Sequence, residues 1–238
     1  MRCRRCHGPV LTRWHVGSEG DSSRDMNAWP SPESLTLTLP PGVGLRWFRD
    51  DELEALPALL ERWYPAVRVG AESVFLDAAF LRRHLASPVR ETSDLWVCAI
   101  VLDGAVVGFQ AFERNVASRT LHGRLGVLAP EARAGMLGAL GFPLFEALGA
   151  VIGAESLQVF VTLATKGQQL FAERRGFRLA GLVPGFDRDA QADGTVKRVM
   201  EALYVKSLVE VSWPEAGALT AKTRAAFAVL FPEQVSGA

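Results

Sequence analysis

Several features are scarce in this 238-residue sequence, and each scarcity narrows the class of protein. Three cysteines are too few for the disulfide framework of a small secreted protein, which favours a reducing compartment. No apolar run reaches the roughly 20 residues that a membrane span needs. The basic N-terminus, MRCRRCHGPVLTRWH, lacks the apolar core of a signal peptide. We therefore expect a cytoplasmic protein with no membrane partner.

Net charge is also lacking, because 26 basic residues balance 26 acidic ones. A neutral chain has no general electrostatic attraction for nucleic acid or for an anionic membrane surface, so we expect neither as a partner. Apolar residues, in contrast, make up 49% of the chain. That proportion is ordinary for a globular protein, and the length suits one large domain with extensions.

Local patterning divides the chain into three parts. Residues 1–43 contain clusters of Gly, Ser, Asp and Pro without sustained periodicity, and we expect an irregular extension, in which the alternating stretch Leu35–Leu39 could add an edge strand. Residues 44–208 alternate between strand and helix periodicity and form the main domain. Residues 209–238 are expected to form a helical tail, with a helix over 213–234.

The periodicity of the main domain predicts an α/β fold, in which a mixed, mostly antiparallel sheet of about seven strands carries helices on both faces. Asp103-Gly104 is a strong hairpin signal, and Gly176 is a natural helix C-cap. Pro143 should kink its helix or start it afresh. The expected strands are 45–49, 94–102, 105–113, 120–128, 156–163, 177–186 and 197–208, the last two joined by a polar loop, 187–195. The expected helices are 50–63, capped by Asp50 and Asp51, then 73–85, 132–153 and 165–176.

One segment, Gly-Val-Leu-Ala-Pro-Glu-Ala-Arg-Ala-Gly-Met-Leu-Gly (126–138), carries a chemical signal. It runs from a strand through a turn into a helix, whose first N–H groups lack intrahelical acceptors. The helix dipole adds to their attraction for anions, so a pyrophosphate suits this position. A helix start in which small residues serve only close packing is the other interpretation.

This segment and a second one, Gln-Leu-Phe-Ala-Glu-Arg-Arg-Gly-Phe-Arg (169–178), resemble motifs of the GNAT superfamily of N-acetyltransferases, and the resemblance covers about residues 45–208. It implies the GNAT fold, acetyl-coenzyme A as co-substrate, and acyl transfer to a primary amine of a small molecule or peptide. A homodimer is one expected assembly. The residues implied to bind coenzyme A are Val127, Leu128, Arg133, Ala134, Gly135, Met136, Leu137 and Gly138. Met136 departs from the family pattern, which has glycine there.

The same resemblance suggests where the chemistry occurs. Backbone N–H groups of Val127 and Leu128 would polarise the thioester carbonyl, as in an oxyanion hole. An ammonium acceptor must lose a proton, and His122 is the first candidate base, with Glu113 second. The other interpretation of His122 is a strand residue satisfied by a neighbour or by solvent.

The general acid is missing from its expected position. Many family members have a tyrosine where this chain has Ala172. A non-catalytic acyl-coenzyme A sensor or scaffold is therefore the alternative function.

The N-terminus offers a further alternative. Cys3 and Cys6, with His7 or His15, could supply three zinc ligands, but a second cysteine pair is lacking. We expect no metal, and a disordered or incorrectly assigned N-terminus is the competing interpretation.

Overall fold

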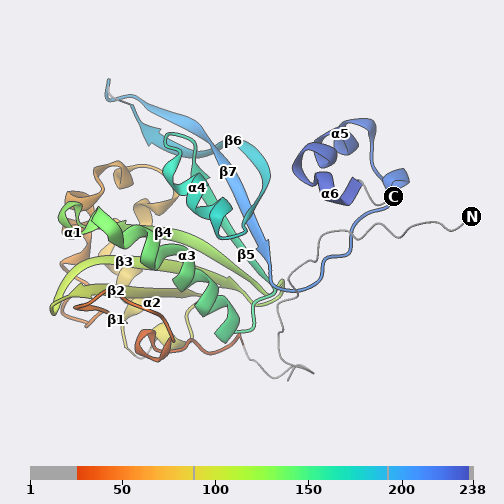
Figure 1. Cartoon of the computed structure of the whole chain (residues 1–238). Coiled ribbons are helices and arrows are strands. Elements are labelled where there is room, and N and C mark those ends of the chain that lie inside the picture. The colour runs from red at the N-terminus through yellow and green to blue at the C-terminus, as the bar shows by residue number, and fades with distance from the viewer. Residues whose placement is uncertain (1–25, 88, 192, 236–238) are drawn as a thin grey trace, which may run out of the picture.

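A computed structural model describes residues 26–87, 89–191 and 193–235 (Figure 1). Within these ranges the chain forms one sheet of seven strands in the order β1-β2-β3-β4-β5-β7-β6. Neighbouring strands are antiparallel except β4 and β5, which are parallel. The strands are β1 (Val43–Trp47), β2 (Leu95–Leu102), β3 (Ala105–Asn115), β4 (Thr120–Leu128), β5 (Ser156–Thr162), β6 (Arg178–Ala190) and β7 (Val196–Ser207).

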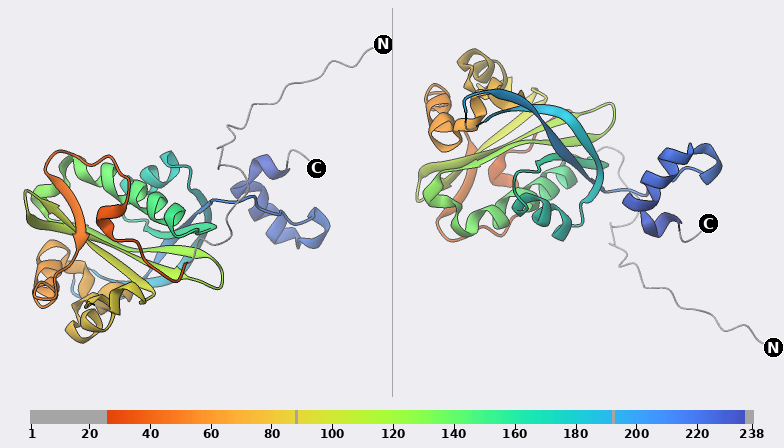
Figure 2. Two further views of the ribbon diagram at one scale, coloured as in Figure 1. Left: turned by 90° about the horizontal axis from the view of Figure 1, so that it is seen from below. Right: turned by 90° about the horizontal axis from the view of Figure 1, so that it is seen from above.

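Helices cover both faces of the sheet (Figure 2). On one face lie α3 (Arg133–Val151) and α4 (Gly167–Arg174), and on the other lie α1 (Leu56–Trp63), α2 (Ala78–Leu85) and the short helices η2 (Pro65–Arg68) and η3 (Ala71–Leu76). The remaining short helices are η1 (Pro32–Ser34), η4 (Val89–Glu91), η5 (Pro130–Ala132) and η6 (Ala216–Ala218). No helix in the described ranges is long and apolar enough to cross a bilayer.

Aromatic side chains of β3 fill the core on both faces. Phe112 stacks on Phe145 of α3, with ring centroids 5.1 Å apart. Phe109 points to the opposite face and packs against Phe75 of η3, at 6.0 Å. Since successive strand residues alternate between faces, residues of β3 and β4 can be assigned to the α3 layer or to the α1–η3 layer.

The predicted order of strands and helices is confirmed, and the local signals explain much of it. Asp103 and Gly104 both have positive φ (49° and 85°), as a two-residue hairpin turn requires. Gly176 ends α4 with φ 76°. A parallel crossover runs from β4 through α3 to β5, and α3 continues through Pro143 as one helix.

Both helices before β2 differ from the prediction. The first begins only at Leu56, with Pro57 in its first turn, and Asp50 instead accepts a hydrogen bond from the Ser87 N–H at 3.1 Å. The predicted helix 73–85 is two pieces, because Asp77 has extended backbone and caps α2 through the Ala79 N–H.

Three predictions near the ends of the chain were also wrong. Residues 35–40 form no strand, because the leucines there pack on the core without joining a ladder. The last hairpin is longer than expected, since β6 runs to Ala190 and includes the first four residues of the predicted polar loop. The tail helix is shorter: α5 (Ala221–Leu230) begins after its cap Thr220, and α6 (Pro232–Val235) follows.

The described part of the N-terminal extension belongs to the core. Met26, Trp29 and Leu35 are each less than 10% exposed. The buried Arg114 donates a hydrogen bond to the Met26 carbonyl, and the Trp96 indole donates one to the Pro30 carbonyl at 3.0 Å. The irregular segment therefore covers one face of the sheet as a strap.

Candidate active site

A gap opens between the two parallel strands at the centre of the sheet. β4 and β5 are paired only from Thr120 opposite Ser156 to Gly123 opposite Val159, although both strands continue further. The register of β4 against β3 shifts at this point, which leaves Arg124 as the extra residue of a bulge. A bulge bends its strand, so the carboxyl ends of β4 and β5 diverge.

Backbone donors of β4 line this gap. Ala129 donates its N–H to the Val107 carbonyl at 2.7 Å, toward β3. Because antiparallel strand residues direct their polar groups alternately to either side, the N–H of Val127 also faces β3, and those of Gly126 and Leu128 face the gap. The register thus supports Leu128 as a donor but places Gly126, rather than Val127, beside it. The bulge at Arg124 cannot be predicted from the sequence alone, so Gly126 is not among the predicted donors.

The N-terminus of α3 lies at the mouth of the gap. Its cap is Ala132, whose side chain makes no capping hydrogen bond. The predicted coenzyme A residues that follow Arg133 have their backbone in the first turns of this helix: Ala134, Gly135, Met136, Leu137 and Gly138.

The Arg133 side chain makes two hydrogen bonds to backbone carbonyls of the protein. It donates to the Leu128 carbonyl at 3.1 Å and to the Trp63 carbonyl at 2.6 Å, and so joins the end of α1 to the end of β4. Trp63 is 3% exposed, and its indole N–H has no acceptor among the described residues. A buried orphan donor beside the gap is consistent with a ligand that would supply the acceptor.

The two predicted bases lie together on the α1–η3 face. His122 lies opposite Glu113 in the β3–β4 ladder. Phe112, the residue before Glu113 in β3, points to the α3 face, so Glu113 and His122 point to the α1–η3 face. Desolvation lowers the pKa of His122, so the imidazole is neutral at pH 7. The Glu113 carboxylate accepts a hydrogen bond from Arg124, as does Glu72 of η3 at 3.1 Å.

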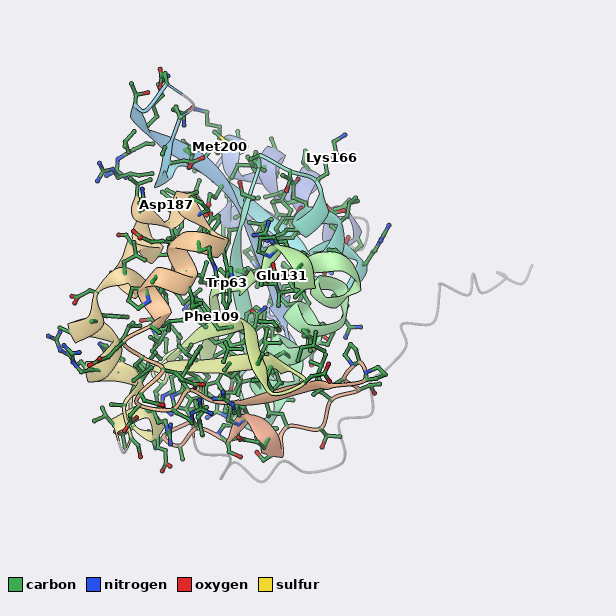
Figure 3. The ribbon with its side chains drawn as sticks, turned by 90° about the vertical axis from the view of Figure 1, so that its left-hand side faces the viewer. Trp63, Phe109, Glu131, Lys166, Asp187 and Met200 are labelled. Carbon is green, nitrogen blue, oxygen red and sulfur yellow. The ribbon has the colours of Figure 1, made fainter. Side chains whose placement is uncertain are left out.

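Carboxylates from distant segments complete this face. Asp187 of β6 accepts the Ala71 N–H at 2.8 Å, which docks the β6–β7 hairpin on η3. Glu201 of β7 lies opposite Thr162, the last residue of β5. Burial is the main cause that raises the pKa of Glu201 from 4.5 to about 7, and the negative charges of Asp187 and Glu72 raise it further. Figure 3 shows the side of the molecule on which Trp63, Glu131 and Asp187 mark α1, the turn before α3 and the hairpin.

Aromatic rings lie beside these carboxylates. Phe160, two residues before the end of β5, stacks on Phe186 of β6 with ring centroids 3.5 Å apart. Phe160 and Thr162 share a face of β5, so the stack adjoins Glu201. No sequence signal identified Glu72, Asp187 or Glu201, because the fold brings them together from three separate segments.

The expected tyrosine position contains no acid. Ala172 is fully buried in α4. The nearby Tyr204 donates its hydroxyl proton to Glu173 at 2.8 Å, and burial raises its pKa to about 12. Cys3 and Cys6 of the N-terminal zinc hypothesis lie outside the described residues.

Comparison with known proteins identifies the fold. No family model and no curated protein matches the sequence. Solved structures do match. The microcin C7 self-immunity acetyltransferase MccE, in complex with acetyl-CoA and AMP, aligns with a TM-score of 0.57 at 14% identity, over 75% of this chain and 99% of that one.

Two further structures give similar values. A spermidine N-acetyltransferase from Vibrio cholerae has a TM-score of 0.55 at 12% identity, over 71% of this chain and 95% of that one. The ribosomal-protein-S5-alanine acetyltransferase from Vibrio fischeri has a TM-score of 0.55 at 10% identity, over 72% and 96%. The chain therefore has the GNAT N-acetyltransferase fold, as its motifs predicted.

Proposed function

We propose that this protein is an acyl-coenzyme A-dependent N-acyltransferase, which transfers acetyl from acetyl-coenzyme A to a primary amine of a small molecule or protein. The observation that carries the proposal is the gap between β4 and β5. It combines the N–H groups of Gly126 and Leu128, which the register directs away from β3, with the N-terminus of α3, where the cap residue Ala132 makes no side-chain hydrogen bond.

The gap suits the two polar parts of an acyl-coenzyme A. The N–H groups of Gly126 and Leu128 would bind the thioester carbonyl and the pantetheine arm, and the first turn of α3 would bind the pyrophosphate. Fixed amide donors stabilise the oxygen of the tetrahedral intermediate, where negative charge develops. A neighbouring structure, MccE, contains acetyl-CoA, and this supports the choice of thioester.

The amine would approach from the α1–η3 face. His122 and Glu113, the bases that the sequence suggests, lie there, and α3 occupies the opposite face. The neutral amine attacks the thioester carbon, the C–S bond breaks, and the electron pair leaves with sulfur. A proton lost by the nitrogen ends on the thiolate, either through water or through solvent exchange.

The non-catalytic alternative has one observation in its favour, the buried Ala172 at the expected tyrosine position. A domain without a general acid can bind the thioester and release thiolate too slowly for turnover. Binding and turnover must therefore be measured separately.

Thiol release with acetyl-coenzyme A tests the proposal. The acceptor panel is ethanolamine, benzylamine, 1,4-diaminobutane and a peptide with a free N-terminal alanine, with the acetylated product identified by mass. We expect amine-dependent release with at least one acceptor. Binding of acetyl-coenzyme A without release by any of them would favour the sensor.

A pair of variants of α3 locates the cofactor site. Gly138→Trp introduces a bulky side chain near the start of α3 and should weaken acetyl-coenzyme A binding about 10-fold or more, about 1.4 kcal/mol. Val151→Trp adds the same side chain at the other end of α3, where Val151 is 50% exposed. Unchanged binding in Gly138→Trp, or equal loss in both variants, would contradict the assignment.

A further inference from the structure

Glu201 differs from Glu113, Glu72 and Asp187 on the α1–η3 face because no hydrogen bond or ion pair within the described residues holds its carboxylate. Glu113 and Glu72 both bond to Arg124, and Asp187 accepts the Ala71 N–H. No described residue makes a hydrogen bond or ion pair to the Glu201 carboxylate.

The position of Glu201 follows from the register of β7. Ala202 and Tyr204 are buried, and the Tyr204 hydroxyl reaches Glu173 of α4. Alternation therefore directs Glu201 to the opposite face, the face of η3. Asp187 lies opposite Val199, which shares this face with Glu201, and the charges of Asp187 and Glu72 both act on Glu201.

Glu201 consequently borders the gap from the β5 side. Its ladder partner Thr162 ends β5, the strand that diverges from β4. On the β4 side, the bulge residue Arg124 holds Glu72 and Glu113. The end of β4 and Glu201 thus flank the region where the proposed function requires the thioester carbon.

We infer that Glu201 is a catalytic residue of the proposed acyl transfer, where it binds the acceptor ammonium and takes its proton. The inference rests on the proposed function. Glu201 accepts one proton from R–NH₃⁺, and the freed lone pair forms the N–C bond. The C–S bond then breaks, the second proton passes from nitrogen to sulfur, and Glu201 later releases its proton to water.

The chemistry of the surroundings fits this role. An ammonium group offsets the mutual repulsion of Glu201, Asp187 and Glu72, and the stacked Phe160 and Phe186 offer apolar or cation–π contact to the carbon chain next to it. A carboxylate with a pKa of about 7 is a stronger base than an ordinary glutamate and still ionises near neutrality.

Other titratable groups lie near Glu201, and the pH profile must distinguish their titration from that of Glu201. Tyr64 lies at the end of α1, and burial followed by the charges of Asp189, Glu201 and Asp187 raises its pKa, so it stays protonated near neutrality. Lys197, which lies opposite Asp189 in the β6–β7 ladder, is further along the same face of the hairpin. His122 is the competing base, and its pKa lies below its usual 6.5.

The test compares Glu201→Gln, Glu201→Asp and the control Asp193→Asn, which removes a carboxylate from the exposed hairpin loop. The acceptor is the panel amine with the highest wild-type kcat/KM. We expect Glu201→Gln to lower kcat/KM about 100-fold or more. The kcat/KM of Glu201→Asp should lie between those of Glu201→Gln and the wild type, and that of Asp193→Asn should equal the wild-type value. Calorimetric binding of acetyl-coenzyme A should be unchanged in all three, which also shows that they are folded.

The pH profile identifies the base. In the wild type, log kcat/KM should fall below pH about 7, and this limb should be absent from Glu201→Gln. A limb below 6.5 that persists in Glu201→Gln and disappears in His122→Asn would assign the proton to His122 and overturn the inference. Loss below twofold in Glu201→Gln would also overturn it. A wild type that neither binds nor consumes acetyl-coenzyme A would instead refute the proposed function.

Discussion

Docking of the β6–β7 hairpin depends on the absence of a side chain at Gly70. Gly70 has φ 93° and ψ −176°, a conformation adopted almost only by glycine. A Cβ at this position would lie 2.7 and 2.8 Å from the Asp187 carboxylate oxygens and 2.9 Å from the Arg188 carbonyl oxygen. The backbone carbonyl cannot rotate away as a side chain can, so Gly70→Ala must distort the backbone or separate the hairpin from η3.

The expected cost has two parts. Backbone strain contributes about 1–3 kcal/mol, and the steric overlap adds about 1–3 kcal/mol. We expect a total near 3 kcal/mol, which lowers Tm by about 6–12 °C in a domain of this size. Because the hairpin carries Glu201, kcat/KM for the amine should fall more than acetyl-coenzyme A binding does.

Gly104→Ala is the matched control for Gly70→Ala. Gly104 also has positive φ, 85°, but a Cβ there meets no atom within 4 Å. It should cost about 1 kcal/mol from backbone strain alone. Thermal unfolding of Gly70→Ala, Gly104→Ala, Asp187→Ala and the double variant Gly70→Ala/Asp187→Ala measures the steric part. Equal losses of stability in Gly70→Ala and Gly104→Ala would refute the contact between the hairpin and η3. Strict additivity of the Gly70→Ala and Asp187→Ala losses in the double variant would refute it as well.

Three further predictions concern the core and the site. Arg114→Met removes the donor to the Met26 and Thr92 carbonyls and should cost about 3 kcal/mol in urea unfolding; a loss below 1 kcal/mol would mean that the strap contributes little. Burial raises the pKa of the Cys98 thiol, so iodoacetamide should label it only after denaturation, as mapped by mass spectrometry, and native labelling would contradict its burial. The pKa of Glu201 is about 7 in the folded protein, against 4.5 for an ordinary glutamate in the unfolded chain. The wild type therefore loses stability as the pH rises from 4.5 to about 7, and the non-titrating Glu201→Gln does not. After allowance for partial exposure, Glu201→Gln should be about 1–2 kcal/mol more stable than the wild type at pH 8 and equal at pH 4.5; no difference at pH 8 would place the carboxylate in water.

Local signals were enough for the order of the elements. Asp103-Gly104 and Gly176 specify backbone conformations that few other residues adopt, so the hairpin and the end of α4 could be predicted directly. The two early helices could not. Leu53, Leu56 and Leu60 have helical spacing, but periodicity does not show where Pro57 starts the helix, and Asp77 breaks the next helix by serving as a cap.

The site required long-range information. The segment 126–138 marked the strand and helix that flank the gap, but the choice between Val127 and Gly126 as donor depends on the bulge at Arg124. Glu201 reaches the site only because β7 inserts between β5 and β6 and pairs with the end of β5. The pairing of β7 with β5 cannot be predicted from the local pattern of a single sequence.

Titration calorimetry of the wild-type protein with acetyl-coenzyme A tests most directly whether the β4–β5 gap is a thioester site. We expect saturable binding with one site per chain, competition by free coenzyme A, and weaker binding in Gly138→Trp but not in Val151→Trp. Absence of binding by the wild type would contradict the assignment of the gap and leave the protein with the GNAT fold but without its co-substrate.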